Sequence, residues 1–341
     1  MERKLAMILV IGGSSFIGVH VIERLRKDGF EVATTGRRDT FKDYYSRLNV
    51  PYYKIDITDK EAFNSLPQKD IDAVILLAAL LPANTCADLQ TVDNAADYFE
   101  VNTIGTINVL EYCRKNRIGR MISTSSYADV SKAWKKNVPL TEEEPRNYGY
   151  LGDHAAYVFS KNAASDIMEY YNQQHGMSNA VFRLPPVFGV GPHGSLHVNG
   201  KLVKSGIQIF IDNAIKGDDI CIHGDKTLSR DIVYVKDVAQ AFSKALKSDE
   251  TRGLYNITSG NAVTLEEQAS AAIEVFSKPS KKSQITYAPD IKNSTPSFLF
   301  SIEKAHHDFG YTPDYPYFKD MLQDYKNELG NKKYREIFGL L

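Results

Sequence analysis

Unbroken apolar segments alternate with segments of helical periodicity through the first half of the chain. Apolar residues recur at helical spacing over residues 16–28 and again over residues 101–115, which predicts a helix in each range. Short apolar or β-branched runs lie around these helices, at residues 5–11, 31–35, 72–79, 120–124 and 180–184. A strand that is apolar on both faces belongs in a parallel sheet with helices on both sides. The pattern therefore predicts a doubly wound α/β fold for this half of the chain.

The second half of the chain has a different texture. After Pro185-Pro186, glycines recur at positions 189, 191, 194 and 200, which indicates an irregular, loop-rich segment. We therefore expect a first domain over residues 1–185 and a second lobe over residues 186–341. Two further strand-like runs, at residues 232–235 and 254–257, are expected to return to the first sheet, so that parts of 228–258 belong with the first domain.

Composition and charge narrow the class of protein. The 341 residues carry 41 Lys and Arg against 42 Asp and Glu, so the formal charge of −1 provides no field that favours nucleic acid or an anionic membrane. Gly12 and Gly13 interrupt the N-terminal apolar run before it completes a signal peptide or a membrane span. The three cysteines form no CxxC pair, so we expect no disulfide framework. His306 and His307 are adjacent and would diverge on a helix, and His193 and His197 lack carboxylate partners at helical spacing, so we expect no metal site. A cytoplasmic protein is the default expectation.

A glycine-rich turn separates the first expected strand from the first expected helix. It reads Gly12-Gly13-Ser14-Ser15-Phe16-Ile17-Gly18. The backbone N–H groups of such a turn and the N-terminus of the helix that follows can approach a pyrophosphate. Because Ser15 replaces the middle glycine of the usual pattern, its backbone must adopt a conformation that a Cβ atom tolerates. The turn predicts a dinucleotide-binding site.

An arginine pair follows the second expected strand, where an acidic residue would bind the ribose of NAD. The strand is followed by Gly36-Arg37-Arg38, and the first carboxylate after it is Asp39. Arginines form bidentate, charge-assisted bonds to a 2′-phosphate, so the sequence favours NADP over NAD; two solvated surface arginines are the other interpretation. Further along, Asp56, beside Ile57, is placed either to bond the adenine amino group or to cap a helix.

A tyrosine and a lysine lie four residues apart, at Tyr157 and Lys161, in a segment with helical character. Their side chains therefore share one face of the helix. A nearby ammonium and a positive nicotinamide ring both favour phenolate, which lets a tyrosine exchange a proton with a sugar hydroxyl at working pH. Hydroxyl side chains run from Ser123 to Ser126 off the end of another expected strand, where open parallel sheets bind ligands.

Together these motifs resemble the extended short-chain dehydrogenase/reductase family, in particular its nucleotide-sugar epimerases, dehydratases and reductases, over nearly the whole chain. The matching stretches are the glycine turn, Leu77-Ala78-Ala79, Val101-Asn102-Thr103-Ile104-Gly105-Thr106, the serine run to Ser126, Tyr157 to Lys161, Arg183 to Pro192, and Arg230 to Ala239. The resemblance implies a Rossmann-like sheet with a smaller C-terminal substrate-binding α/β lobe. It also implies a nicotinamide cofactor and a nucleotide-diphosphate sugar as substrate.

The resemblance implies a role for each catalytic candidate. Tyr157 is the expected general acid/base, and Lys161 the cation that lowers its pKa and bonds the nicotinamide ribose. Ser126 is the expected hydroxyl partner, while one or two residues of slippage would give Ser125 or Thr124 instead.

The same resemblance implies how the two ligands are held. Arg230 is expected to grip the substrate pyrophosphate; a local ion pair with Asp231 is the alternative. The expected cofactor contacts are Gly12, Ser14, Ser15, Phe16, Ile17, Gly18, Arg37, Arg38, Asp56, Ile57, Leu77, Ala78, Ala79, Asn102, Thr124, Tyr157, Lys161, Pro185 and Val187.

One departure from the family pattern bears on the reaction. The dehydratase branch places an Asp-Glu pair directly after its hydroxyl residue, whereas Tyr127-Ala128 stand here, which disfavours dehydration and decarboxylation. A 4-epimerase acting through a transient 4-keto sugar is the expected function, and an NADPH-dependent nucleotide-4-keto-sugar reductase is the alternative. A non-catalytic NADP-binding regulator is a second alternative, but such a protein has no need of a complete proton relay.

The resemblance also implies a homodimer. Family members often pair through two helices of each subunit, and here the ranges Val101 to Lys115 and Tyr157 to Gln173 are expected to form that four-helix contact.

Overall fold

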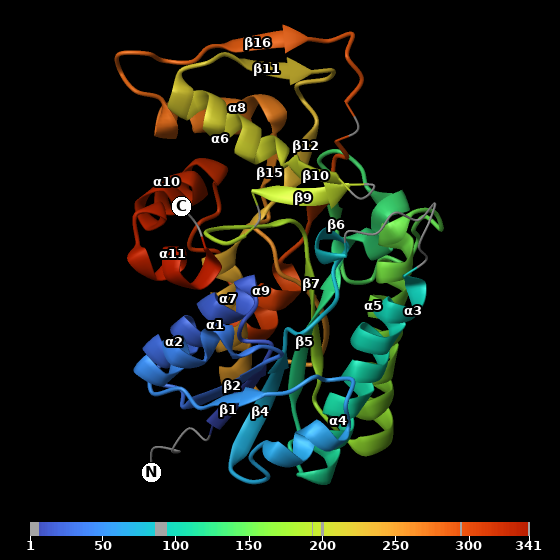
Figure 1. Cartoon of the computed structure of the whole chain (residues 1–341). Coiled ribbons are helices and arrows are strands. Elements are labelled where there is room, and N and C mark those ends of the chain that lie inside the picture. The colour runs from blue at the N-terminus through green and yellow to red at the C-terminus, as the bar shows by residue number, and fades with distance from the viewer. Residues whose placement is uncertain (1–6, 86–93, 193, 199–200, 294, 340–341) are drawn as a thin grey trace.

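A seven-stranded parallel sheet forms the lower part of the molecule in the computed structural model, which describes residues 7–85, 94–192, 194–198, 201–293 and 295–339 (Figure 1). Its strand order is β14-β7-β5-β4-β1-β2-β3. The strands are β1 (Met7–Ile11), β2 (Val32–Gly36), β3 (Tyr52–Lys54), β4 (Ile71–Leu76), β5 (Met121–Ser126), β7 (Ala180–Leu184) and β14 (Gly253–Asn256). The predicted fold class, a doubly wound α/β sheet of Rossmann type, is confirmed.

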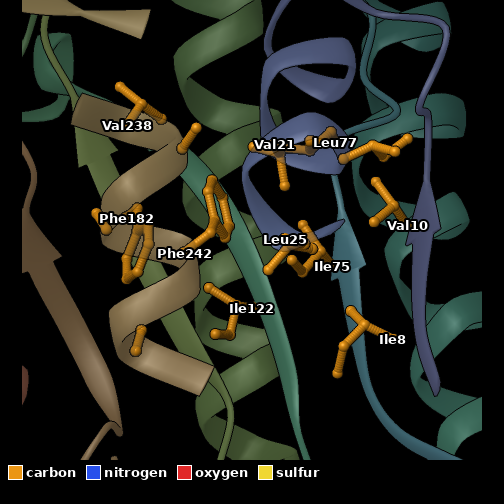
Figure 2. Packing of buried hydrophobic residues seen from close by; sticks show 14 of the residues in the cluster. Ile8, Val10, Val21, Leu25, Ile75, Leu77, Ile122, Phe182, Val238 and Phe242 are labelled. Carbon is orange, nitrogen blue, oxygen red and sulfur yellow. The ribbon is translucent and has the colours of Figure 1, made fainter. Parts of the chain in front are cut away.

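Helices cover both faces of this sheet, and each face carries its own apolar cluster. Helices α1 (Phe16–Lys27), α2 (Lys42–Arg47), α7 (Val235–Lys247) and α9 (Glu303–Phe309) pack on one face. Helices α4 (Gly105–Lys115) and α5 (Asp153–His175) pack on the other. Side chains alternate between the two faces, so that Ile8 and Val10 face α1 while Leu9 and Ile11 face α4 and α5 (Figure 2).

The strands and helices predicted for the first half are observed with small shifts at their ends. The helix predicted over residues 16–28 ends at Lys27, and the strand predicted over 5–11 is described from Met7, since residues 5 and 6 lie outside the described part of the chain. The helix predicted over 101–115 is regular only over α4. It is preceded by α3 (Ala95–Tyr98) and by a π-helical segment, η4 (Phe99–Ile104), which has an extra residue per turn.

The two strand-like runs expected to return to the sheet behave differently. Residues 253–256 form β14 and pair with β7, as expected. The expectation for 232–235 is wrong, because β13 (Val233–Tyr234) pairs instead with β8 (Val187–Phe188) in a separate two-stranded sheet. The free edge of β7 is already occupied by β14, and Pro185-Pro186 separates β8 from β7.

A smaller α/β unit lies above the C-terminal ends of the strands (Figure 1). Its apolar cluster is formed by α6 (Gly206–Lys216), α8 (Leu265–Phe276), α10 (Phe318–Leu329) and β11 (Ile220–His223). The remaining strands are short pairs: β11 with β16 (Ile285–Ala288), β12 (Ser229–Asp231) with β15 (Ala262–Thr264), β9 (Ser195–Val198) with β10 (Lys201–Lys204), and β6 (Pro139–Leu140) with β17 (Leu299–Phe300). Short 3-10 helices complete the described chain: η1 (Asp39–Phe41), η2 (Glu61–Ser65), η3 (Pro82–Asn84) and η5 (Tyr127–Ala133).

The last described helix packs back on the first. In α11 (Lys332–Phe338), Lys333 pairs with Glu23 of α1 at 2.8 Å, and Tyr334 is buried against His20. Within the described residues, no helix is both long and apolar enough to cross a membrane.

Candidate functional site

The glycine turn lies at the C-terminal end of β1 and leads into α1. Ser15 is the N-cap of α1 with extended backbone angles (φ −86°, ψ 164°), and its hydroxyl accepts a hydrogen bond from the Gly18 N–H at 3.1 Å. Serine therefore stands in place of the usual middle glycine without strain. Gly12, in contrast, has φ +96°, and a Cβ atom there would collide with the backbone N of Ala78. This tight turn before a helix N-terminus fits the pyrophosphate of a dinucleotide.

Phe16, the first residue of α1, serves the core with its side chain. Its ring is buried, lies 5.6 Å from the ring of His20, and would be struck by a side chain at Gly191. Any contact of Phe16 with a cofactor must therefore come from its backbone. The loop after β7, with the predicted contacts Pro185 and Val187, folds over the same helix, because the Val190 carbonyl lies 3.1 Å from Nε2 of His20.

The end of β2 lies beside the turn, since a Cβ atom at Gly36 would come within 2.7 Å of Oγ of Ser14. Arg37 and Arg38, which follow, are exposed and form no ion pair within the described residues. Asp39 instead pairs with Lys54 at 2.8 Å, and this lysine holds the pKa of the carboxyl below its usual value. The carboxylate nearest the two arginines in sequence is thus paired with a different cation, Lys54.

Asp56 and Ile57 lie after β3, where the adenine was expected. Oδ1 of Asp56 accepts hydrogen bonds from the N–H and the hydroxyl of Thr58, at 3.0 and 2.9 Å, so the carboxylate stabilises a turn. The carbonyl of Ile57 accepts a bond from Nδ2 of Asn108 in α4. This geometry is closer to the capping interpretation of Asp56.

Asn102 joins three segments that surround the site. Its amide exchanges hydrogen bonds with the backbone of Leu80, at 2.8 and 3.1 Å, and donates to Oγ of Ser160 at 3.0 Å. The π-helical turn thereby fixes the Leu77 to Ala79 loop, another predicted cofactor contact, against α5. In this arrangement the Asn102 amide positions backbone around the site.

Tyr157 and Lys161 lie one turn apart on α5. Lys161 is buried, and burial lowers the pKa of its ammonium to about 8. It has no carboxylate partner in the described chain. Burial also raises the pKa of Tyr157, with smaller contributions from Tyr127 and Tyr98, and the Tyr98 ring meets Tyr157 edge-on at 6.0 Å. The phenol is therefore protonated at neutral pH and needs added positive charge to act as a base.

The hydroxyl side chains of β5 have separate surroundings. Ser123 donates to the Leu76 carbonyl at 3.2 Å, a structural bond within the sheet. Ser126 ends the strand, and its oxygen accepts a hydrogen bond from the Ala128 N–H at 3.3 Å, which leaves its own proton to donate elsewhere. Alternation along the strand places Ser125 on the face of Met121 and α5, and Thr124 and Ser126 on the face of Ile122.

Arg230 lies on β12 and is largely buried. Burial lowers the pKa of its guanidinium, with an opposing effect of the Tyr127 hydroxyl, and its Nε has no hydrogen-bond partner among the described residues. The alternative of a local pair with Asp231 is wrong: Asp231 accepts from the Ser259 hydroxyl at 2.6 Å and from the Phe300 N–H at 3.2 Å. Within the part of the chain that the structure describes, Arg230 is a buried cation without an anion.

A second buried arginine, Arg183, has the hydrogen-bond and ion-pair partners that Arg230 lacks. The sequence alone did not reveal its partner. Arg183 of β7 donates two bonds to Oδ2 of Asp129, at 3.1 and 3.0 Å, and one to Oδ1 of Asn256 at 3.2 Å. Both ends of the pair are almost inaccessible to solvent. This pair ties β7 to η5, the segment that follows Ser126.

An aromatic cluster behind Ser126 is also absent from the predictions. Tyr127 stacks on Trp134 with ring centroids 5.1 Å apart and an interplanar angle of 8°, and Phe298 lies 5.0 and 4.8 Å from these two rings. The only signal in the sequence is the departure of Tyr127 from the family pattern. Among the described residues, no group of His, Cys, Asp or Glu is placed to hold a metal ion.

The comparisons with known proteins agree with this geometry. The model of the "NAD dependent epimerase/dehydratase family" matches residues 8–258. A putative UDP-glucose 4-epimerase of Methanocaldococcus jannaschii is 31% identical over 268 residues, covering 76% of this chain and 79% of that protein. A UDP-N-acetyl-alpha-D-glucosaminuronate decarboxylase of Bacillus cytotoxicus is 27% identical, covering 82% and 83%.

A solved structure shows the same fold. The UDP-glucose 4-epimerase of Thermus thermophilus, in complex with NAD, superimposes with a TM-score of 0.71 at 25% identity, covering 94% of this chain and 98% of that one. The fold therefore extends over nearly the whole length of both proteins.

Proposed function

Because the chain belongs to the NAD-dependent epimerase/dehydratase family, we propose that it interconverts nucleotide-diphosphate hexoses that differ at C4, through a 4-keto sugar. One observation carries this proposal: Tyr157 and Lys161 lie one turn apart on α5, Lys161 is buried, and neither side chain has a carboxylate partner among the described residues. A site with one phenol and one hydroxyl can move a proton on and off a sugar oxygen.

Elimination of water or carbon dioxide would call for a further acid near Ser126. The nearest acid in sequence, Asp129, is held in the buried pair with Arg183. With Ser126 as the hydroxyl residue, Tyr127 and Ala128 follow it where the dehydratase branch has its Asp-Glu pair. The chemistry that these residues support is therefore confined to oxidation and reduction at one carbinol.

The chain's own residues have distinct tasks in this reaction. Tyr157 takes the proton of the sugar 4-hydroxyl and later returns it to the 4-keto oxygen. The Ser126 hydroxyl, whose oxygen already accepts the Ala128 N–H, donates to that same oxygen, and Ser125 is the alternative donor. The Lys161 ammonium supplies positive charge that favours the phenolate. The bound nicotinamide supplies the hydride acceptor at C4 and the hydride donor for the return step.

The substrate is a nucleotide-diphosphate sugar, and the named relatives point to UDP-hexoses. Arg230 is the residue proposed to bind the diphosphate, since it is largely buried, has no anion among the described residues, and carries a desolvation cost that a ligand phosphate would offset. In this proposal residues 1–185, with parts of 228–258, form the cofactor-binding domain, and residues 186–341 contribute the substrate-binding lobe.

We propose NADP rather than NAD as the cofactor. Arg37 and Arg38 are exposed, have no ion-pair partner in the described part of the chain, and follow the strand that lies beside Ser14. The acid that could repel a 2′-phosphate, Asp39, is bound to Lys54. The same two arginines favour the second candidate function, an NADPH-dependent reductase of nucleotide-4-keto sugars.

We also propose that two subunits pair through residues 101–115 and 157–173, which include α4 and most of α5. The large apolar side chains Phe99 and Ile104, at the two ends of the π-helical segment, are exposed, as is Tyr170 of α5. Light scattering at micromolar concentration should give twice the mass of the chain, and a monomeric mass would contradict the proposal.

The first experiment separates the two candidate functions. Mass spectrometry of the cofactor released from purified protein identifies NADP or NAD, and the protein is then mixed with UDP-glucose or UDP-galactose without added cofactor. An epimerase converts each sugar into the other and keeps its cofactor. A protein that consumes NADPH only with a 4-keto sugar is the reductase. Release of NAD alone would overturn the interpretation of Arg37 and Arg38.

A further inference from the structure

Tyr127 links the two ends of the proposed substrate site. It follows Ser126 directly in the chain, at the point where β5 ends and η5 begins. Its ring lies 5.0 Å from the ring of Phe298, which forms a β-bridge with Arg230, and its phenol influences the pKa of both Tyr157 and Arg230.

The Tyr127 ring is held rigidly from behind. It stacks on Trp134 and packs against Phe298, which is fully buried. The backbone of Phe298 is tied to the strand that carries Arg230, since Phe298 N–H donates to the Ser229 carbonyl at 3.1 Å and Asp231 N–H donates to the Phe298 carbonyl at 3.1 Å. The three rings therefore form one unit with β12, here called the Tyr127 wall (Tyr127, Trp134 and Phe298).

The Tyr127 wall has one hydroxyl, that of Tyr127, which is available to bind a ligand. Among the described residues, the Tyr127 hydroxyl has no hydrogen-bond partner, although its side chain is largely buried. Burial keeps the pKa of this phenol above its ordinary value, so that it stays a neutral O–H donor near neutral pH. A largely buried donor without a partner is costly unless a ligand completes it.

We propose that Tyr127 is a substrate-binding residue that recognises the sugar ring, donating its hydroxyl to a ring substituent between the reacting C4 oxygen and the diphosphate. This inference rests on the proposed function, because it takes Tyr157 as the residue at C4 and Arg230 as the residue at the diphosphate. Between those two points a nucleotide-diphosphate hexose has only its sugar ring. The ligand class is therefore a hexose with a hydrogen-bond acceptor on that edge.

The test compares two ligands that differ only by the sugar. Isothermal titration calorimetry measures the dissociation constants of UDP and of UDP-glucose for the wild type, Tyr127→Phe and Arg230→Met. Tyr127→Phe should weaken UDP-glucose about five- to tenfold, the loss of one hydrogen bond, and leave UDP unchanged. Arg230→Met should weaken both ligands alike. The matched control is Tyr150→Phe, an exposed tyrosine outside the wall, which should change neither.

The outcomes separate this inference from the proposed function. Suppose that the wild type binds UDP-glucose. If the Tyr127→Phe variant then binds UDP and UDP-glucose as tightly as the wild type does, or if its affinity for both falls equally, Tyr127 does not recognise the sugar. If the wild type binds neither ligand, the proposed substrate class fails and this inference fails with it.

The chain's single tryptophan gives an independent readout, since Trp134 is the ring stacked on Tyr127. Its emission should change with UDP-glucose and not with UDP. An equal change with both ligands would place the wall at the diphosphate and overturn the assignment to the sugar.

Discussion

Arg183 and Arg230 are buried side chains on neighbouring parts of the molecule, but they satisfy their charges in opposite ways. Arg183 is surrounded by acceptors from Asp129, Asn256 and the Thr141 carbonyl. Arg230 is affected electrostatically by the Tyr127 hydroxyl and has no anion among the described residues. A buried arginine whose charge is paired within the protein has a structural role. A largely buried arginine without an anion in the protein is available to bind an anionic ligand.

The largest expected effect is on turnover, when Tyr157 of the candidate catalytic site is substituted. Tyr157→Phe removes the proton carrier and should reduce turnover by about 10³- to 10⁴-fold. Binding of UDP, which lacks the sugar, and the melting temperature should stay within error of the wild type, because the Tyr157 hydroxyl has no hydrogen-bond partner among the described residues. Turnover is measured as the approach to equilibrium between UDP-glucose and UDP-galactose. Retained activity would show that another group carries the proton.

Substitution of Arg183, whose charge is paired within the protein, should instead lower the free energy of unfolding. Arg183→Met leaves the Asp129 carboxylate buried and unpaired, which should cost about 3–5 kcal/mol of unfolding free energy in urea titration. The double variant with Asp129→Leu should recover part of that loss, because both charges are then absent. If the single variant were as stable as the wild type, the distinction between the two arginines would not hold.

Lys161 is a further buried cation without a carboxylate partner among the described residues, and its effect on stability can be measured as a function of pH. Its pKa is lowered by burial from 10.5 to about 8 in the folded, ligand-free protein. Between pH 8 and 10.5 the unfolded chain therefore binds a proton that the folded chain does not, so stability rises with pH in this window. Relative to Lys161→Met, the wild type should gain up to about 3 kcal/mol across it in denaturant titrations. A flat difference would mean that the ammonium is solvated or paired.

Arg230→Met should have a smaller effect than the substitutions of Tyr157, Arg183 and Lys161, and the sign of its effect on thermal stability is the informative part. Affinity for UDP should fall about 10- to 30-fold, the loss of one charge-assisted contact. Thermal stability should stay the same or rise, because an unpaired buried charge has been removed. A fall in melting temperature comparable to that of Arg183→Met would show that Arg230 has a structural partner.

The fold was largely readable because the strands of the central sheet are buried on both faces. Runs such as residues 72–79 have few polar positions, and only a parallel sheet between two helical layers hides them. The short run 232–235 has the same local character, but its pairing depends on which sheet edge remains free, a property of the whole assembly. The π-helical turn at 99–104 was also invisible, since one additional residue per turn hardly changes a short apolar pattern.

The candidate site was readable where its chemistry depends on spacing within one element. Tyr157 and Lys161 lie one turn apart, so their shared face follows from helix geometry. Arg183 and Arg230 could not be distinguished, because what separates them is Asp129, 54 residues before Arg183, and the lack of a counterpart for Arg230 among the described residues. Tyr127 stood out only as an unusual residue, and its stack on Trp134 depends on how η5 turns after the strand.

The return of β14 to the central sheet has a consequence for how the protein is made. During synthesis on the ribosome, β7 is available from residue 184, but its neighbour β14 is not translated until residue 256, and α11, which covers α1, is nearly the last segment to emerge. Until then the nascent chain exposes an unpaired β7 edge and an uncovered apolar surface, the features that chaperones bind and proteases attack. A stop codon between residues 188 and 253 should therefore yield a fragment that the cell degrades, even though all of the expected cofactor-binding residues are already present.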